Sequence, residues 1–282
     1  MVERRASLGI LAHVIMILGV IVVVFPVYLA FVASTHTPQE IAQAPMPLLP
    51  GHNFWESYRT ALTGGGRTSG SASVVRMMQV SFVITLIITF GKISISLLSA
   101  FAVVYFRFPL RNLCFWLIFI TLMLPVEVRI GPTYQVVASL GMINTFAGLS
   151  VPLIASATAT FLFRQFFLTL PDELVEAARV DGAGPLRFFK DILLPLSKTS
   201  IAALFVIQFI YGWNQYLWPL IAATSESMYP IVVGIKAMAG NGEAQVDWNV
   251  VMATGILAML PPALVVMLMQ KWFVKGLVDT EK

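Results

Sequence analysis

Residues 170–198 read LPDELVEAARVDGAGPLRFFKDILLPLSK, a polar segment between two long apolar stretches. It is longer than the linkers of about two to eight residues that usually join neighbouring helices, so we expect it to have structure of its own. Gly182 supplies the permissive backbone needed where a first helix ends. Pro185 can start a second short helix, and we expect Pro195 to end it. The segment therefore predicts a pair of helices.

The start of the first helix carries several signals. Pro171 suits the first helical position, and the acidic residues after it favour the positive end of the helix dipole. Thr169 with Asp172 resembles a capping box. We therefore expect the helix to begin near Pro171.

Long apolar runs flank this segment and recur along the chain. The sequence is 58% hydrophobic and 11% charged, far from the roughly 25% charge of soluble domains. A helix needs about 20 mostly apolar residues to cross a membrane, and six stretches meet this requirement. The chain is therefore predicted to be an all-α, polytopic membrane protein with one domain, residues 1–282. The six stretches are Leu8–Ala33, Val80–Phe106, Leu113–Pro132, Phe146–Phe166, Ile201–Ala222 and Val250–Phe273.

Basic residues predict the orientation of these spans. Cytoplasmic loops retain more Lys and Arg than translocated ones, and most basic residues fall on one side when the N-terminus is placed inside. Both termini are therefore expected in the cytoplasm. Residues 34–78 then form an external loop, and residues 167–200 lie inside the cell with the helix pair.

The cytoplasmic segment also carries a known motif. Its defining positions are Glu176, Ala177, Ala178, Gly182, Ile192, Leu194 and Pro195. At each of them the segment resembles the "EAA" loop of ABC importer permeases. The resemblance implies that the helix pair docks into a cleft on a cytosolic ATPase subunit and transmits its opening and closing. A short amphipathic hairpin on the membrane surface is the alternative, but it explains neither the glycine spacing nor the ending at Pro195.

Further stretches resemble the carbohydrate, or maltose-type, permeases, and more narrowly the second permease subunits of sn-glycerol-3-phosphate importers. They are FRFPLRN (106–112), TLMLPVEVRI (121–130), ATATFLFRQFF (157–167), FIYGWNQYLWPL (209–220) and GLVDTEK (276–282). The resemblance implies uptake of sn-glycerol-3-phosphate or related glycerophosphodiesters across the bacterial inner membrane. It also implies partners: a second, homologous permease subunit, two copies of an ABC ATPase and an external solute-binding protein. Another sugar or polyol remains an alternative solute.

Polar residues inside the spans are candidates for the translocation path, because such groups usually face other helices or a water-filled cavity. In the second span, Lys92 lies on one helical stripe with Ser81, Thr85, Ser96 and Ser99. In the fifth, a similar stripe holds Gln208, Tyr211, Gln215 and Trp218, with Asn214 beside it. Helix packing is the competing interpretation for the serines. For Lys92 we keep both a structural ion pair and a role near the path. Arg129 with Glu127 is expected to be a local pair or an interface anchor, in preference to a ligand.

The sequence predicts no catalytic centre and no bound cofactor. It lacks a phosphate-binding glycine loop, so ATP and Mg are expected to be used by the separate ATPase chain. One cysteine, Cys114, and three scattered histidines give no metal-ligand spacing. A self-contained secondary transporter is the runner-up, but none of the six stretches has a central Asp or Glu for ion coupling. An intramembrane enzyme would need a nucleophile and base at depth, and neither is evident.

Overall fold

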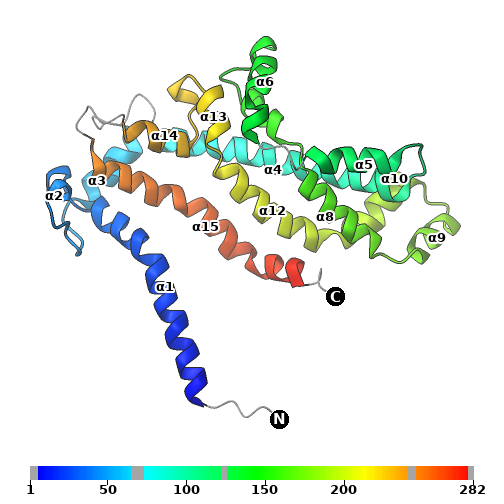
Figure 1. Ribbon diagram of the computed structural model, residues 1–282, viewed down its shortest axis with the longest axis horizontal. Helices are drawn as coiled ribbons and strands as arrows, with labels where there is room; N and C mark the ends of the chain where they lie inside the picture. The colour runs from blue at the N-terminus through cyan, green and yellow to red at the C-terminus, as the bar shows by residue number, and fades with distance from the viewer. Residues whose placement is uncertain (1–5, 65–72, 122–125, 241–245, 279–282) are drawn as a thin grey trace. The chain divides into compact units, whose positions relative to one another are not determined.

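A computed structural model describes residues 6–64, 73–121, 126–240 and 246–278, and the regular elements in these ranges are helices (Figure 1). Residues 65–72 of the expected external loop and the side chain of Glu127 lie outside the described part. The elements are α1 (Ala6–Ser34), α2 (Pro38–Ala42), α3 (Phe54–Thr63), α4 (Val74–Tyr105), α5 (Arg111–Ile120), α6 (Val126–Ser139), α7 (Phe146–Ser150), η2 (Val151–Leu153), α8 (Ala157–Leu168), α9 (Glu173–Val180), α10 (Pro185–Phe188), η3 (Phe189–Leu193), α11 (Leu194–Leu196), α12 (Lys198–Trp213), α13 (Leu217–Ala222), η4 (Glu226–Met228), α14 (Ile231–Met238) and α15 (Trp248–Val278).

Among the described residues, three helices are long and apolar enough to cross a membrane: Gly9–Ser34, Val74–Tyr105 and Trp248–Trp272. Two bent pairs raise the number to five if each is one span. They are Phe146–Leu153 with Ala157–Leu168, bent by 49°, and Pro185–Leu196 with Lys198–Trp213, bent by 71°. The third expected span is divided between α5, which has ten residues, and α6.

The fifth expected span is not one helix, and this prediction was wrong. Helix α12 ends at Trp213, and α13 begins at Leu217. Pro219 explains the break, because a proline inside a continuous helix would lose a hydrogen bond and clash with the carbonyl of Gln215. The new start at Leu217 places Pro219 in a first turn, where proline is tolerated.

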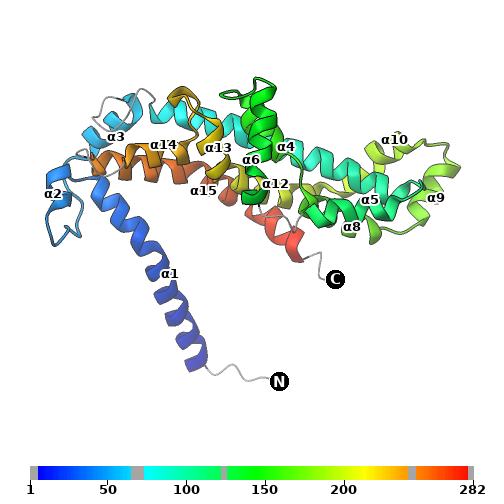
Figure 2. The same cartoon turned by 45° about the horizontal axis from the view of Figure 1, so that its top comes forward.

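The helices form two compact units, Met1–Arg76 with Gly234–Leu260, and Met77–Val233 with Pro261–Lys282. In the second unit, one core cluster joins α4, α8, α9, α10 and α12 around Phe163 and Leu193. Another joins the earlier half of α4 to α6, α7 and α13 around Leu149 and Trp218. Figures 1 and 2 show α5, α8, α9 and α10 gathered toward one end of α4.

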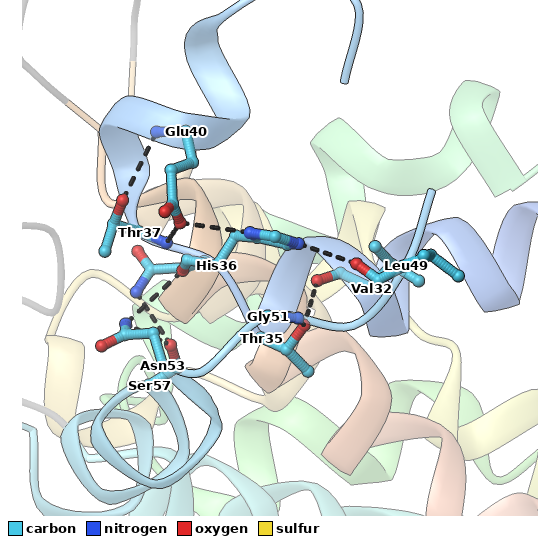
Figure 3. Close-up of polar contacts among 10 residues, drawn as sticks. Val32, Thr35, His36, Thr37, Glu40, Leu49, Gly51, Asn53 and Ser57 are labelled. Atoms are coloured by element: carbon cyan, nitrogen blue, oxygen red, sulfur yellow. Dashed lines mark hydrogen bonds and ion pairs between the residues drawn. The ribbon is translucent and has the colours of Figure 1, made fainter. Parts of the chain in front are cut away.

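In the first unit, side chains along most of α1 are exposed, and burial begins only at Val32, near the end of the helix. From Ser34 onward the chain turns into α2 and α3 through a set of hydrogen bonds (Figure 3). Thr37 caps α2 with a full capping box that includes Glu40. Such apolar exposure along α1 fits contact with lipid or another membrane subunit.

Candidate functional site

The expected helix pair is present, and Gly182 forms the turn between its helices. Its φ is +69°, the left-handed region that favours glycine. The backbone N–H of Gly182 donates to the Arg179 carbonyl at 3.0 Å, and that of Ala183 to the Ala178 carbonyl at 2.8 Å. This is the Schellman arrangement, which closes the last turn of α9.

The start of α9 differs from the expectation. Thr169 forms no capping box, because its hydroxyl donates to the Phe166 carbonyl at 2.7 Å and so completes the preceding helix α8. Asp172 is the N-cap of α9 but makes no side-chain capping bond. A threonine between two helices can serve either one, and here the carbonyl three residues before it takes the hydroxyl.

The second helix does not end at Pro195. Helix α10 runs on through the π-helix η3 into α11, and Pro195 lies inside α11. The wider π turn precedes Pro195, which cannot donate the hydrogen bond that an α-turn requires there. Further support comes from Ser197, whose hydroxyl donates to the Leu193 carbonyl at 2.7 Å. The chain therefore bends toward α12 instead of stopping.

Burial divides the motif into an anchoring and an exposed set. Ala178, Phe188 and Leu193 are buried in the core cluster with α4 and α8. The motif residues Glu176, Ala177, Gly182, Leu194 and Pro195 are exposed, and Ile192 is half-buried. Of the two alanines, only the exposed Ala177 is open to close approach by a partner, because Ala178 packs within this chain.

Two exposed apolar side chains near the turn were missed by the sequence reasoning. Val180 is 88% exposed and Leu186 is 78% exposed, on α9 and α10. The available signal was their position: both are apolar residues within four positions of Gly182 in an otherwise polar segment. Large apolar side chains exposed beside a charged residue are typical of contact surfaces.

On α4, the predicted polar stripe faces the protein interior. Ser81, Thr85, Lys92 and Ser96 are buried, and Ser99 is half-buried. Two of the serines have structural partners: Ser81 Oγ accepts from the Ile231 N–H at 2.7 Å, and Ser96 Oγ donates to the Ser156 carbonyl at 3.2 Å. These bonds support the packing interpretation for both.

The threonines of the same face behave differently. Thr85 and Thr89 are fully buried, yet neither hydroxyl has a hydrogen-bond partner among the described residues. Thr89 was missed by the sequence reasoning, although it lies three residues before Lys92 and so shares its face. Close packing surrounds this point, since a Cβ on Gly212 would lie 3.2 Å from the Thr85 Cα.

The fold brings Lys92 against Tyr211. The Lys92 side chain is 5% exposed, and its Nζ lies 3.4 Å from the centroid of the Tyr211 ring. No described carboxylate forms an ion pair with Lys92. Among the described residues, this argues against the interpretation of Lys92 as one half of a structural ion pair. Gln208 is buried one turn earlier on α12.

Asn214 and Gln215 do not continue the stripe. Their side-chain amides donate to the Ile210 carbonyl at 3.0 Å and to the Tyr211 carbonyl at 3.1 Å. These bonds go to carbonyls in the last turn of α12, and the Ile210 carbonyl also accepts from the Asn214 backbone N–H at 3.1 Å. Trp218 lies on α13, where its indole N–H donates to the Gly148 carbonyl at 3.1 Å.

Known proteins are similar to this chain in sequence and in fold. A family model described as "Binding-protein-dependent transport system inner membrane component" matches residues 92–279, about two thirds of the chain. The chain belongs to this family. It is 59% identical over 282 residues to the sn-glycerol-3-phosphate transport system permease protein UgpE of Brucella melitensis, and 59% identical over 283 residues to the protein of that name from Pectobacterium atrosepticum. Both matches cover the full length of each chain.

A solved structure has the same fold as this permease. A chain from the crystal structure of a bacterial ABC transporter, involved in the import of the acidic polysaccharide alginate, gives a TM-score of 0.82. The match covers 97% of this permease and 99% of that chain, with 20% identity. The helical architecture is therefore that of an ABC importer permease, and both the helix pair and Lys92 lie inside the range of the family model.

Proposed function

We propose that this permease subunit takes part in the ATP-driven import of sn-glycerol-3-phosphate or related glycerophosphodiesters. The supporting observation is the full-length identity of 57–59% to UgpE proteins from several bacteria. Its partners are a second permease subunit, two copies of a cytoplasmic ATPase that uses ATP and Mg, and an external solute-binding protein. This chain then supplies part of the path and one of the two docking points for the ATPase.

In the proposed membrane arrangement the chain has six spans and two cytoplasmic ends. The three long helices, the bent pair Phe146–Leu153 with Ala157–Leu168, α12, and α5 with α6 supply these spans. Residues 34–78 lie outside the cell and residues 167–200 inside. The exposed α1 is expected to contact lipid and the second permease subunit.

Coupling to ATP hydrolysis is assigned to the exposed side of the helix pair. Glu176 offers a charge, Ala177 permits close approach, and Val180 and Leu186 offer apolar surface. The buried Ala178, Phe188 and Leu193 connect that surface to α4 and α8. A movement imposed on the pair would therefore pass directly to the membrane helices.

The solute is tested with the assembled complex in proteoliposomes. The expected result is uptake of sn-glycerol-3-phosphate, with ATPase activity stimulated by the loaded binding protein. Stimulation by maltose or another neutral sugar, with none by glycerol-3-phosphate, would contradict the proposed solute.

Coupling is tested with two matched glycines. Gly182→Ala places a side chain at φ +69°, at a cost of roughly 1 kcal/mol. Gly184→Ala is the control, since Gly184 has φ −71° and open space around its would-be Cβ. We expect the ratio of uptake to ATP hydrolysis to fall for Gly182→Ala only. Equal coupling in both variants, at equal membrane levels, would remove Gly182 from the mechanism.

A further inference from the structure

The Lys92 ammonium is covered by an aromatic ring from a different helix. Its Nζ lies 3.4 Å from the Tyr211 ring centroid, and the side chain is 5% exposed. The electron-rich face of a ring attracts a cation, but less strongly than a full negative charge does. In the described part of the chain no carboxylate pairs with Lys92. The ring is thus a weak counter-group for a buried charge.

The face of α4 that carries Lys92 also carries two hydroxyls that could form further hydrogen bonds. Thr85 and Thr89 lie on the same face of α4, and their buried hydroxyls have no partner among the described residues. Lysine side chains on a helix lean toward its N-terminus, so the ammonium extends over the turn that carries Thr89. Buried polar groups are normally satisfied, so two unsatisfied hydroxyls on the face of α4 that carries Lys92 indicate a place for an acceptor.

A second positive charge acts on the same place. Arg129 on α6 is close enough for its charge to act weakly, through solvent screening, on both Lys92 and Tyr211. Its side chain is exposed, whereas Lys92 is buried. Two like charges repel unless an anion lies between or beside them. An acceptor with more than one negative oxygen, such as a phosphate monoester, matches this arrangement.

We propose that Tyr211 is a displaceable cover over an anion site formed by Lys92 and the hydroxyls of Thr85 and Thr89. In the state described here the ring face holds the ammonium. During passage the phosphate group of the solute takes the place of the ring and accepts hydrogen bonds from the ammonium and the hydroxyls. The ring then returns and helps to release the anion. This inference rests on the proposed import of a phosphorylated solute.

The test measures thermal stability of the purified permease–ATPase complex against increasing sodium phosphate, with sodium chloride of equal ionic strength as the reference. Tyr211→Phe keeps the ring face and should respond like the wild type. Tyr211→Leu removes the competing ring, so the half-maximal phosphate concentration should fall by a factor of about 2 to 30. The double variant with Lys92→Met should lose that response. Phosphate bound at the ATPase sites is common to all variants and cancels in the comparison.

An unchanged phosphate response in Tyr211→Leu, or a response that persists in the double variant, would overturn the proposal. If Tyr211→Leu does not assemble, Lys92→Met alone decides. It leaves an apolar side chain under the ring and should assemble without the phosphate response seen in the wild type. A Lys92→Met complex that still responds like the wild type would also overturn the proposal.

A separate experiment distinguishes failure of the anion site from failure of the proposed solute. Wild-type proteoliposomes are assayed for glycerol-3-phosphate uptake, and glycerol-3-phosphate replaces phosphate in the stability assay. A Lys92-dependent phosphate response without uptake would support the site and contradict the proposed solute. Uptake without any Lys92-dependent response to either anion would support the solute and overturn the site.

Discussion

Two sets of polar side chains in this permease differ in how well their hydrogen bonds are satisfied. In the Thr35 network of the first unit (Thr35, His36, Thr37, Glu40, Gly51, Asn53 and Ser57), each residue has a partner (Figure 3). Thr35 Oγ1 donates to the Val32 carbonyl at 2.6 Å and accepts from the Gly51 N–H at 2.8 Å. On α4, by contrast, the hydroxyls of Thr85 and Thr89 have none in the part of the chain described.

Threonine therefore has two roles in this permease, one structural and one that we assign to the solute path. The Thr35 network holds the chain where it leaves α1, and its groups bond to one another. On α4 the Thr85 and Thr89 hydroxyls find no acceptor among the described residues, at a cost of about 1–3 kcal/mol each. We attribute this cost to the proposed anion site, because polar groups kept inside membrane spans are usually functional.

The largest expected effect comes from Thr35→Val. The change is isosteric, but it leaves the part-buried Gly51 N–H without its acceptor. We expect a loss of about 1–3 kcal/mol in stability. Transport per assembled complex should stay near that of the wild type. The measurement is thermal unfolding of the purified complex beside an uptake assay at matched protein levels. An unchanged unfolding temperature would mean that the Thr35 network does not stabilise the fold.

The same substitution on α4 should have the opposite pattern. Thr89→Val removes a buried hydroxyl that has no partner in the described residues, so stability should be unchanged or rise by up to about 1 kcal/mol. Uptake should fall by up to about tenfold, the equivalent of about 1.4 kcal/mol at the anion site. Thr85→Val is a second test of the same face. Destabilisation by both variants with normal transport would remove the contrast between the two regions.

Local signals in the sequence were enough for the helix pair and for the buried face of α4. Gly182 and Pro185 act on their own turns, and the spacing of Lys92 and Thr85 fixes their shared face whatever surrounds it. The break before Leu217 was less accessible. It depends on how the chain accommodates Pro219, and apolar composition alone predicts one uninterrupted helix across this residue.

Contacts between distant residues were beyond the sequence. Lys92 and Tyr211 meet only because α4 packs against α12. An unsatisfied hydroxyl is likewise a property of the whole environment, so Thr89 gave no signal beyond its helical position. The outward direction of Val180 and Leu186 also depended on which neighbours, such as Ala178 and Phe188, were taken into the core.

The smallest expected effect concerns the charge of Glu40 in the Thr35 network. The backbone N–H of Thr37, 2.9 Å from Glu40 Oε2, and then the His36 ring at 3.1 Å hold the pKa of this carboxyl below its ordinary value. A lowered pKa means that the folded state binds the proton less tightly than the unfolded state. The stabilisation is therefore present at neutral pH and is lost as the pH falls through the lowered pKa.

Glu40→Gln keeps an acceptor for the Thr37 N–H but removes the charge that strengthens the bond. Because Glu40 is exposed, the effect is screened by solvent and should be a small drop in melting temperature at neutral pH. Wild type and variant should converge as the pH falls below the ordinary carboxyl range. The measurement is the difference between their melting temperatures across a pH series. A difference that persists unchanged in acid would show that the amide disturbs α2 in some other way and that the Glu40 charge contributes nothing to the network.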